Sequence, residues 1–137
     1  MAHLFIRWDE SHLTGLAIID EQHRGLVSVI NSFFFHKNDP FIERILVPTA
    51  LMAINLAKIH CLTEQQLMEQ ADYPQVEEHT QSHEVMYREL VNVERKARMK
   101  HDPDMLLDYL KKWWSGHAID YDRLYVEHLK GFFGDTV

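Results

Sequence analysis

Apolar residues recur at steps of three and four along most of this chain, which is the spacing of a helix that buries one face. No long stretch alternates in the manner of a half-buried strand, and glycine is scarce, with 5 residues among 137. The sequence therefore predicts an all-α protein. We expect four helices, at about residues 20–37, 41–70, 74–99 and 103–130.

Prolines mark the expected beginnings of three of these helices, because each follows an aspartate by one or two residues. Aspartate accepts hydrogen bonds from the free N–H groups at a helix start, and proline is tolerated in the first turn. The three segments are Asp39-Pro40, Asp72-Tyr73-Pro74 and Asp102-Pro103. Asp20 marks the remaining start, after an irregular N-terminal arm. Short connections favour antiparallel neighbours, so the prediction is an up-down-up-down four-helix bundle, with a late start or a bend at Pro48 in the second helix.

Composition favours one soluble domain over residues 1–137. Acidic residues outnumber basic ones by 21 to 14, a formal charge of −7, which argues against a nucleic-acid or anionic-membrane surface. We expect no targeting segment and no run of the ~20 apolar residues that span a bilayer. The single cysteine, Cys61, excludes an internal disulfide and a Cys-rich metal site. These features predict a cytoplasmic protein without membrane contact, either whole or the N-terminal input domain of a longer protein.

Histidines occupy inward positions in every predicted helix. Of the 10 histidines, five fall in the apolar rows, together with two carboxylates. These residues are His23 in the first helix, His60 and Glu64 in the second, His79 and His83 in the third, and His117 and Asp122 in the fourth. The apolar rows also include Met52 in the second helix and Leu124 in the fourth. The other histidines are expected at the surface: His3, His12, His36, His101 and His128.

Such a set of inward polar groups needs a compensating charge. One inward histidine is usually a satisfied core residue, but five imidazoles and two carboxylates cost several kcal/mol for each charge buried without a partner. Two metal ions compensate all of them, and imidazole with carboxylate suits iron better than calcium or magnesium. His79 and His83, one turn apart, can chelate the same ion. Asp122 lies about 140° around the helix from His117, so we expect it to reach sideways as a bridging ligand.

The order of these motifs resembles that of the bacterial hemerythrins over nearly the whole chain. The matching positions are Trp8, Thr14-Gly15, Asp20-Glu21-Gln22-His23, His60-x-x-x-Glu64 with Leu67-Met68, Tyr73-Pro74, His79-x-x-x-His83, Trp113, and His117-x-x-x-x-Asp122 with Tyr125. The resemblance implies a four-helix bundle that holds two iron ions joined by an oxo or hydroxo bridge. The implied ligands are His79, His83 and His117 on one iron and His23 and His60 on the other, with Glu64 and Asp122 bridging both.

The activity implied by the resemblance is reversible O2 binding, as hydroperoxide, at the iron with two histidines. The ligand count agrees, because five histidines, two bridging carboxylates and one solvent-derived bridge leave one of twelve octahedral positions vacant. The sequence has no Glu-x-x-His pair, which argues against a di-iron protein of the ferritin type. It also has no His-Glu-x-x-His, which argues against a zinc hydrolase.

Three positions depart from the family pattern. Bacterial members typically carry Phe where this chain has Cys61, Ile where it has Ala118, and often a second Glu where it has Gln65. The first two replacements are smaller and predict a wider, wetter pocket, from which bound O2 is lost sooner. Cys61 itself is interpreted either as a small buried hydrophobe or as a thiol that responds to redox conditions.

Three functions fit this site. The first is O2 storage or delivery, and the second is O2 or redox sensing with a fused or partner signalling domain. The third is a di-iron enzyme that acts on peroxide or nitric oxide. We expect a non-enzymatic O2-binding protein, and the smaller pocket residues favour sensing over storage.

Overall fold

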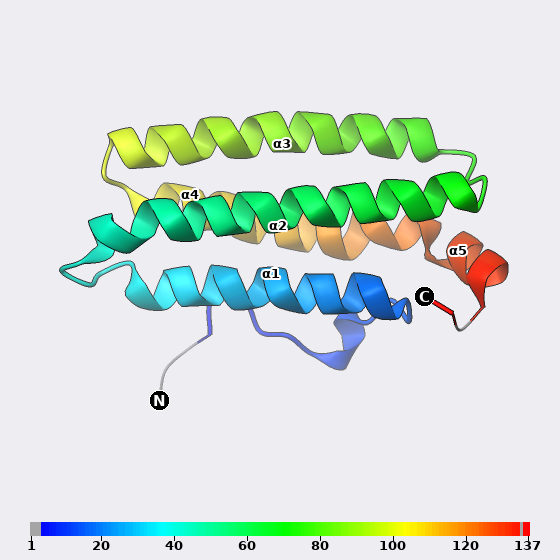
Figure 1. Ribbon diagram of the computed structural model, residues 1–137. Helices are drawn as coiled ribbons and strands as arrows, with labels where there is room; N and C mark the ends of the chain where they lie inside the picture. The colour runs from blue at the N-terminus through cyan, green and yellow to red at the C-terminus, as the bar shows by residue number, and fades with distance from the viewer. Residues whose placement is uncertain (1–3, 135) are drawn as a thin grey trace.

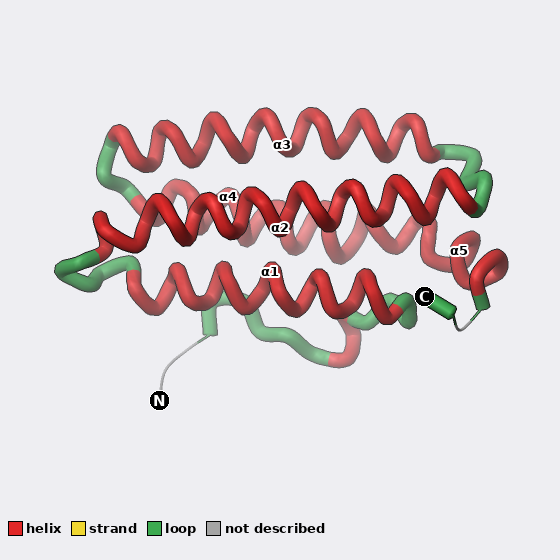
Figure 2. The backbone as a smooth tube through the Cα atoms, viewed as in Figure 1, coloured by secondary structure: helices red, strands yellow, loops and turns green. Residues whose placement is uncertain are grey.

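The computed structural model describes residues 4–134 and 136–137, and in this part of the chain every regular element is a helix. Four long antiparallel segments begin with α1 (Ala17–His36), α2 (Ile42–Gln70), α3 (Val76–Met99) and α4 (Pro103–Trp113). Figure 1 shows them side by side, with α2 between α1 and α3 and in front of α4. The predicted all-α four-helix bundle is confirmed. Figure 2 shows that loops are confined to the helix connections, the N-terminal arm and the C-terminal end.

The predicted helix starts are correct at one proline and shifted at the other two. Asp102 is the N-cap residue of α4, and Pro103 is its first residue. In contrast, α2 and α3 each begin two residues after the proline, which therefore lies in the preceding turn. The expected late start of α2 is wrong, because the helix begins at Ile42. It continues through Pro48. Pro48 removes only one backbone donor from a helix of 29 residues.

The first helix begins at Ala17, three residues before the predicted start at Asp20. Asp20 is buried within its first turn, and its carboxylate accepts hydrogen bonds from Thr14 N, Thr14 Oγ1 and Gly15 N at 2.8, 2.8 and 3.1 Å. Gly15 adopts φ of 86°, a conformation that favours glycine. Asp20 therefore holds the end of the N-terminal arm against α1 instead of capping the helix. That arm contains one short 3₁₀ turn, η1 (Glu10–His12).

The predicted fourth helix, residues 103–130, is not one α-helix. After α4 come a π-helical segment, η2 (Trp114–Tyr121), a 3₁₀ turn, η3 (Asp122–Tyr125), and α5 (Val126–Phe133). Leu124, expected to face inward, is 64% exposed, because π and 3₁₀ turns rotate each residue by a different angle from an α-turn. In α2 the prediction for Met52 is also wrong, since this side chain is 55% exposed.

Two apolar clusters fill the bundle. The larger one joins α1 to α4 and includes Leu26, Ile30 and Cys61, whereas the smaller one includes Leu67 and Tyr125 near the other end. Along α2, His60 and Glu64 therefore lie where one apolar cluster gives way to the other. The bundle encloses polar groups at this level, with apolar packing on both sides.

α2 is more apolar than the sequence analysis expected. By length and hydropathy, its segment Arg44–Gln70 is able to cross a membrane, although only 39% of the most apolar 18-residue window is buried within the bundle. The prediction that no such stretch exists is therefore wrong for this helix. Core helices of bundles pass the same criterion, but here a large part of the apolar surface faces outward.

Candidate metal centre

Seven side chains from all four segments of the bundle meet at one level. The carboxylates belong to Glu64 and Asp122, and the imidazoles to His23, His60, His79, His83 and His117. The His117 side chain is 12% exposed, and the other six are 3% exposed or less. Within each of two overlapping groups, one ligand atom per residue lies within 4.8 Å of all the others, close enough to surround one ion. The groups share the two carboxylates.

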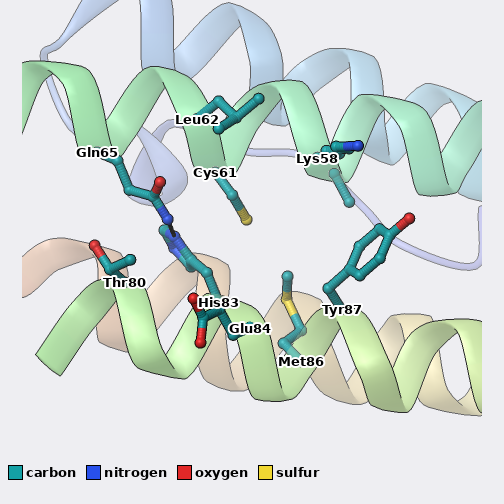
Figure 3. Close-up of a pocket in the computed structure, with 10 residues that line it drawn as sticks. Lys58, Cys61, Leu62, Gln65, Thr80, His83, Glu84, Met86 and Tyr87 are labelled. Carbon is teal, nitrogen blue, oxygen red and sulfur yellow. Dashed lines mark hydrogen bonds between the residues drawn. The ribbon is translucent and has the colours of Figure 1, made fainter. Parts of the chain in front are cut away.

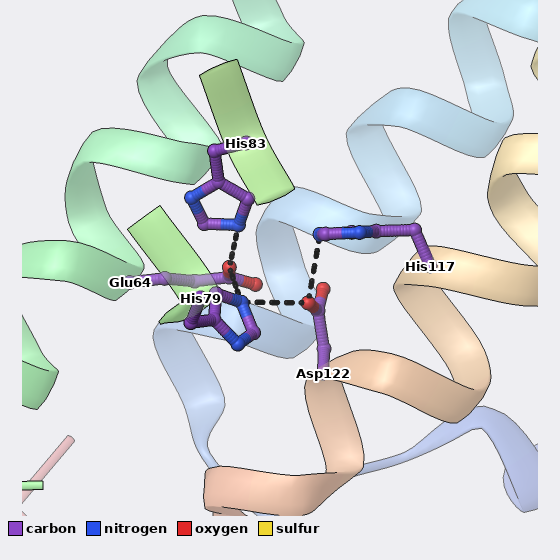
Figure 4. Close-up of side chains that lie close together, drawn as sticks. All are labelled: Glu64, His79, His83, His117 and Asp122. Atoms are coloured by element: carbon purple, nitrogen blue, oxygen red, sulfur yellow. Dashed lines mark hydrogen bonds and ion pairs between the residues drawn. The ribbon is translucent and has the colours of Figure 1, made fainter. Parts of the chain in front are cut away.

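The first group combines the carboxylates with the histidines of α3 and η2 (Figure 4). Glu64 Oε2 lies 2.9 Å from His83 Nε2 and 3.2 Å from His79 Nε2. Asp122 Oδ1 lies 3.3 Å from His79 Nε2 and 3.2 Å from His117 Nε2. Three imidazole nitrogens thus face one oxygen of each carboxylate.

The second group combines the same carboxylates with the histidines of α1 and α2. Glu64 Oε1 lies 2.6 Å from His60 Nε2. Asp122 Oδ2 lies 3.2 Å from His60 Nε2 and 3.4 Å from His23 Nε2. Each carboxylate therefore turns one oxygen to each histidine group, which is the arrangement of a ligand that bridges two metal ions.

The π-helical segment explains how Asp122 joins His117. The Asp122 N–H donates to the carbonyl oxygen of His117, five residues earlier, and so closes the wider turn of a π-helix. Residues five apart in such a turn lie on nearly the same face. The expected sideways reach of Asp122 is therefore unnecessary, because the backbone itself brings its carboxylate toward His117.

Polar side chains beside the cluster orient its members. Gln22 Oε1 lies 2.9 Å from His60 Nδ1, and Gln22 Nε2 donates to Thr63 Oγ1 at 2.9 Å. Tyr125 Oη donates to Glu64 Oε1 at 2.9 Å, from a fully buried position. Gln22 and Tyr125 belong to the motifs that resemble the family, but neither contact was expected from the sequence. The available signal in the sequence was proximity to a predicted ligand, because Gln22 directly precedes His23 and Tyr125 follows Asp122 by three residues.

Replacing Gln22 by Ala is expected to weaken iron binding by about 10–100-fold, because His60 loses the group that fixes its ring. Iron retention under competition with a chelator measures this effect. Gln66→Ala is the matched control, since Gln66 is an exposed glutamine outside the cluster. Equal retention in the two variants would mean that packing alone orients His60.

Charges within the metal-free cluster shift several pKa values. Burial by itself lowers the pKa of His60, but the charge of Glu64 and the contacts with Asp122 outweigh it and raise the pKa to about 10. The same balance raises the pKa of His79 to about 9. Burial and the charge of Asp122 oppose ionisation of Glu64, yet His60 and His79 hold its pKa down to about 2. In the absence of metal, protons on the imidazoles therefore compensate the buried carboxylates.

Metal-free protein is expected to lose stability as the pH rises from 6.5 to about 10. The folded state keeps protons on His60 and His79 over this range, whereas an unfolded histidine with a pKa of 6.5 releases them. This contribution to stability is thus fully present below pH 6.5 and is lost as the pH approaches the folded-state values. Urea unfolding of the metal-free chain at several pH values measures it. A free energy of unfolding that does not fall over this range contradicts the proton balance.

A pocket of about 240 Å³ opens between α2 and α3 beside the cluster (Figure 3). Cys61 and His83 line it, whereas Ala118 is buried in the larger apolar cluster. Of the two smaller residues, Cys61 therefore borders a pocket, which lies beside the three-histidine group. Burial and the charges of Glu64 and Asp122 raise the pKa of the Cys61 thiol, which keeps it protonated and favours its interpretation as a small buried hydrophobe.

The remaining histidines lie apart from the cluster. His36, His101 and His128 are exposed as predicted, whereas His12 is half-buried against Trp114. His3 falls outside the described residues.

Comparison with known proteins supports the same family as the motifs. No family model matches the chain. A bacteriohemerythrin of Stenotrophomonas maltophilia (strain R551-3) is 26% identical over 125 residues, which cover 90% of this chain and 80% of the relative. Bacteriohemerythrins of Pseudomonas paraeruginosa (strain DSM 24068 / PA7) and Pseudomonas aeruginosa (strain LESB58) are 27% identical over 139 residues, covering 100% of this chain and 88% of each relative. The helical bundle, the buried cluster able to hold metal and these relatives, at 26–27% identity, together support a bacteriohemerythrin-like family for this chain.

Proposed function

We propose that this protein holds two iron ions and binds O2 reversibly. His79, His83 and His117 hold one ion, His23 and His60 hold the other, and Glu64 and Asp122 bridge the two. The observation that carries the proposal is the division of each carboxylate, with one oxygen facing each histidine group. Imidazole nitrogen and carboxylate oxygen are a donor set that iron accepts readily.

The residues around His23 and His60 are suited to keeping water away on their side of the cluster. Iron, when bound, supplies the reversible electron transfer that O2 binding requires. His23 and His60 are fully buried, and the ring of Trp114 packs edge-on against His23 at 5.3 Å between centroids. The Tyr125 hydroxyl is engaged with Glu64, and burial raises its pKa well above 10, so it keeps its proton. The second histidine group thus lies in apolar surroundings, with the Tyr125 hydroxyl already engaged.

Metal analysis and O2 titration test the proposal. Protein reconstituted anaerobically is expected to contain two irons per chain and, on exposure to air, to develop an absorption band that disappears when O2 is removed. Metal-free protein is the control. One zinc per chain, or iron that gives no reversible spectral change, contradicts the proposal.

Sensing is the role that we propose for this binding, in a cytoplasmic protein that acts through a fused or partner signalling domain. The pocket at Cys61 supports this role, because it admits water to the cluster beside His83, and an O2 complex with a short life suits a switch better than a store. Steady turnover of peroxide or nitric oxide by the iron-loaded protein would instead favour the enzymatic alternative.

A further inference from the structure

The outward side of α2 carries apolar side chains that remain exposed among the residues that the structure describes. Leu51, Met52, Ile59 and Leu62 are each between 50% and 55% exposed. Asn55 lies among them and is also exposed. We call these five residues the α2 face. Contiguous apolar surface of this kind marks contact sites more often than scattered exposed residues do.

The spacing of the α2 face is that of a helix that packs on another helix. Met52, Asn55, Ile59 and Leu62 follow one another in steps of three, four and three, which is the a and d pattern of a coiled coil. In Figure 1 α2 lies in front of α4 with α1 and α3 to either side, so the remaining side is open to a partner.

The α2 face is complementary to itself when two copies run antiparallel. At 100° per residue, Arg44, Leu51, Leu62 and Glu69 line one edge of the helix, within about 20° of one another. The midpoint of Arg44 and Glu69 in the sequence lies between residues 56 and 57. The midpoint of Leu51 and Leu62 lies at the same place. An antiparallel two-fold arrangement therefore places Arg44 against Glu69 of the second copy and Leu51 against its Leu62, and each contact occurs twice.

The other edge of the α2 face obeys the same symmetry. Met52 and Ile59 lie within about 20° of each other and are centred between residues 55 and 56. This midpoint lies one residue from that of the first edge, so a two-fold axis close to residue 56 also brings Met52 of one copy near Ile59 of the other. Asn55 falls beside the axis, where its amide can bond to that of the second copy. The apolar contacts, the central polar pair and the opposite charges at the ends therefore all form in the same alignment of the two helices, to within one residue.

We propose that the α2 face binds the α2 face of a second copy of this chain, with the two helices antiparallel. The proposal does not depend on iron or O2. A membrane fits less well, because the protein carries a net charge of −7 and only Lys58 adds a positive charge between the two ends of the face.

Sedimentation equilibrium of the iron-loaded chain tests the association. The average mass is expected to rise from one chain to two as concentration increases. Ile59→Glu places like charges in the interface and is expected to raise the dissociation constant at least ~10-fold. Val91→Glu, at an exposed apolar position of α3, is the matched control and should behave as wild type.

Charge exchange and cross-linking test the register. Arg44→Glu and Glu69→Arg are each expected to weaken the dimer, and the double variant to restore it. A mixture of Met52→Cys and Ile59→Cys proteins should form mixed disulfides on mild oxidation, whereas a parallel dimer gives each variant linked to itself. Wild type is the control, since its Cys61 is buried.

Some results overturn the proposal. A mass of one chain at every concentration, or an equal effect of Ile59→Glu and Val91→Glu, rules out the interface. Binding of a monomeric chain to neutral phosphatidylcholine vesicles, abolished by Ile59→Glu, would assign the α2 face to a lipid surface instead.

Discussion

Replacing Glu64 by Ala is expected to reduce bound iron from two ions per chain to less than ~0.5. Glu64 contacts both histidine groups, so its loss removes a ligand from each proposed ion at once. The metal-free variant should also be less stable by about 3 kcal/mol, because the protonated His60 and His79 lose a buried counter-charge. Iron analysis and urea unfolding measure the two effects.

Glu69→Ala is the control for this prediction, since Glu69 is an exposed carboxylate on the same helix. It should retain two irons and wild-type stability in dilute solution. If Glu64→Ala also keeps both irons, Glu64 is not a bridge and the assignment of the carboxylates is wrong.

Replacing Cys61 by Phe is expected to lengthen the life of the O2 complex about 10-fold, which corresponds to ~1.4 kcal/mol in the barrier to its decay. The larger ring fills the pocket of about 240 Å³ beside His83 and excludes water from it. Decay of the oxygenated absorption band at fixed pH measures the lifetime. Cys61→Ser is the control, because it changes the thiol without filling the pocket.

Ala118→Ile is expected to have the smaller effect. The sequence predicts that both Cys61 and Ala118 widen the pocket, but Ala118 is 1% exposed within the apolar cluster. Extra methyl groups there press on packed neighbours and cost ~1–3 kcal/mol of stability. Equal lifetimes of wild type and Cys61→Phe, with iron retained, would remove pocket width as a cause and with it the support for sensing.

Spacing along the chain was sufficient to predict four helices and the inward positions of Glu64 and the five histidines that meet between them. The reason is that inward residues of a helix recur every three or four positions, so a polar residue in an apolar row must be buried wherever the neighbouring helices lie. His79 and His83 are the clearest example, because both occupy the apolar row of α3 and both are buried. Local capping chemistry was less informative, since Asp20 holds a loop and only Asp102 begins a helix as predicted.

Backbone geometry in the last segment depended on the packed structure. Periodicity assumes 100° per residue throughout, whereas η2 inserts a wider turn that brings Asp122 to His117 and leaves Leu124 in solvent. Contacts between helices, such as that of Gln22 with His60, depended on packing in the same way. Periodicity assigns a residue to a face of its own helix, but only packing sets the depth and rotation of neighbouring helices, and with them the distances between side chains.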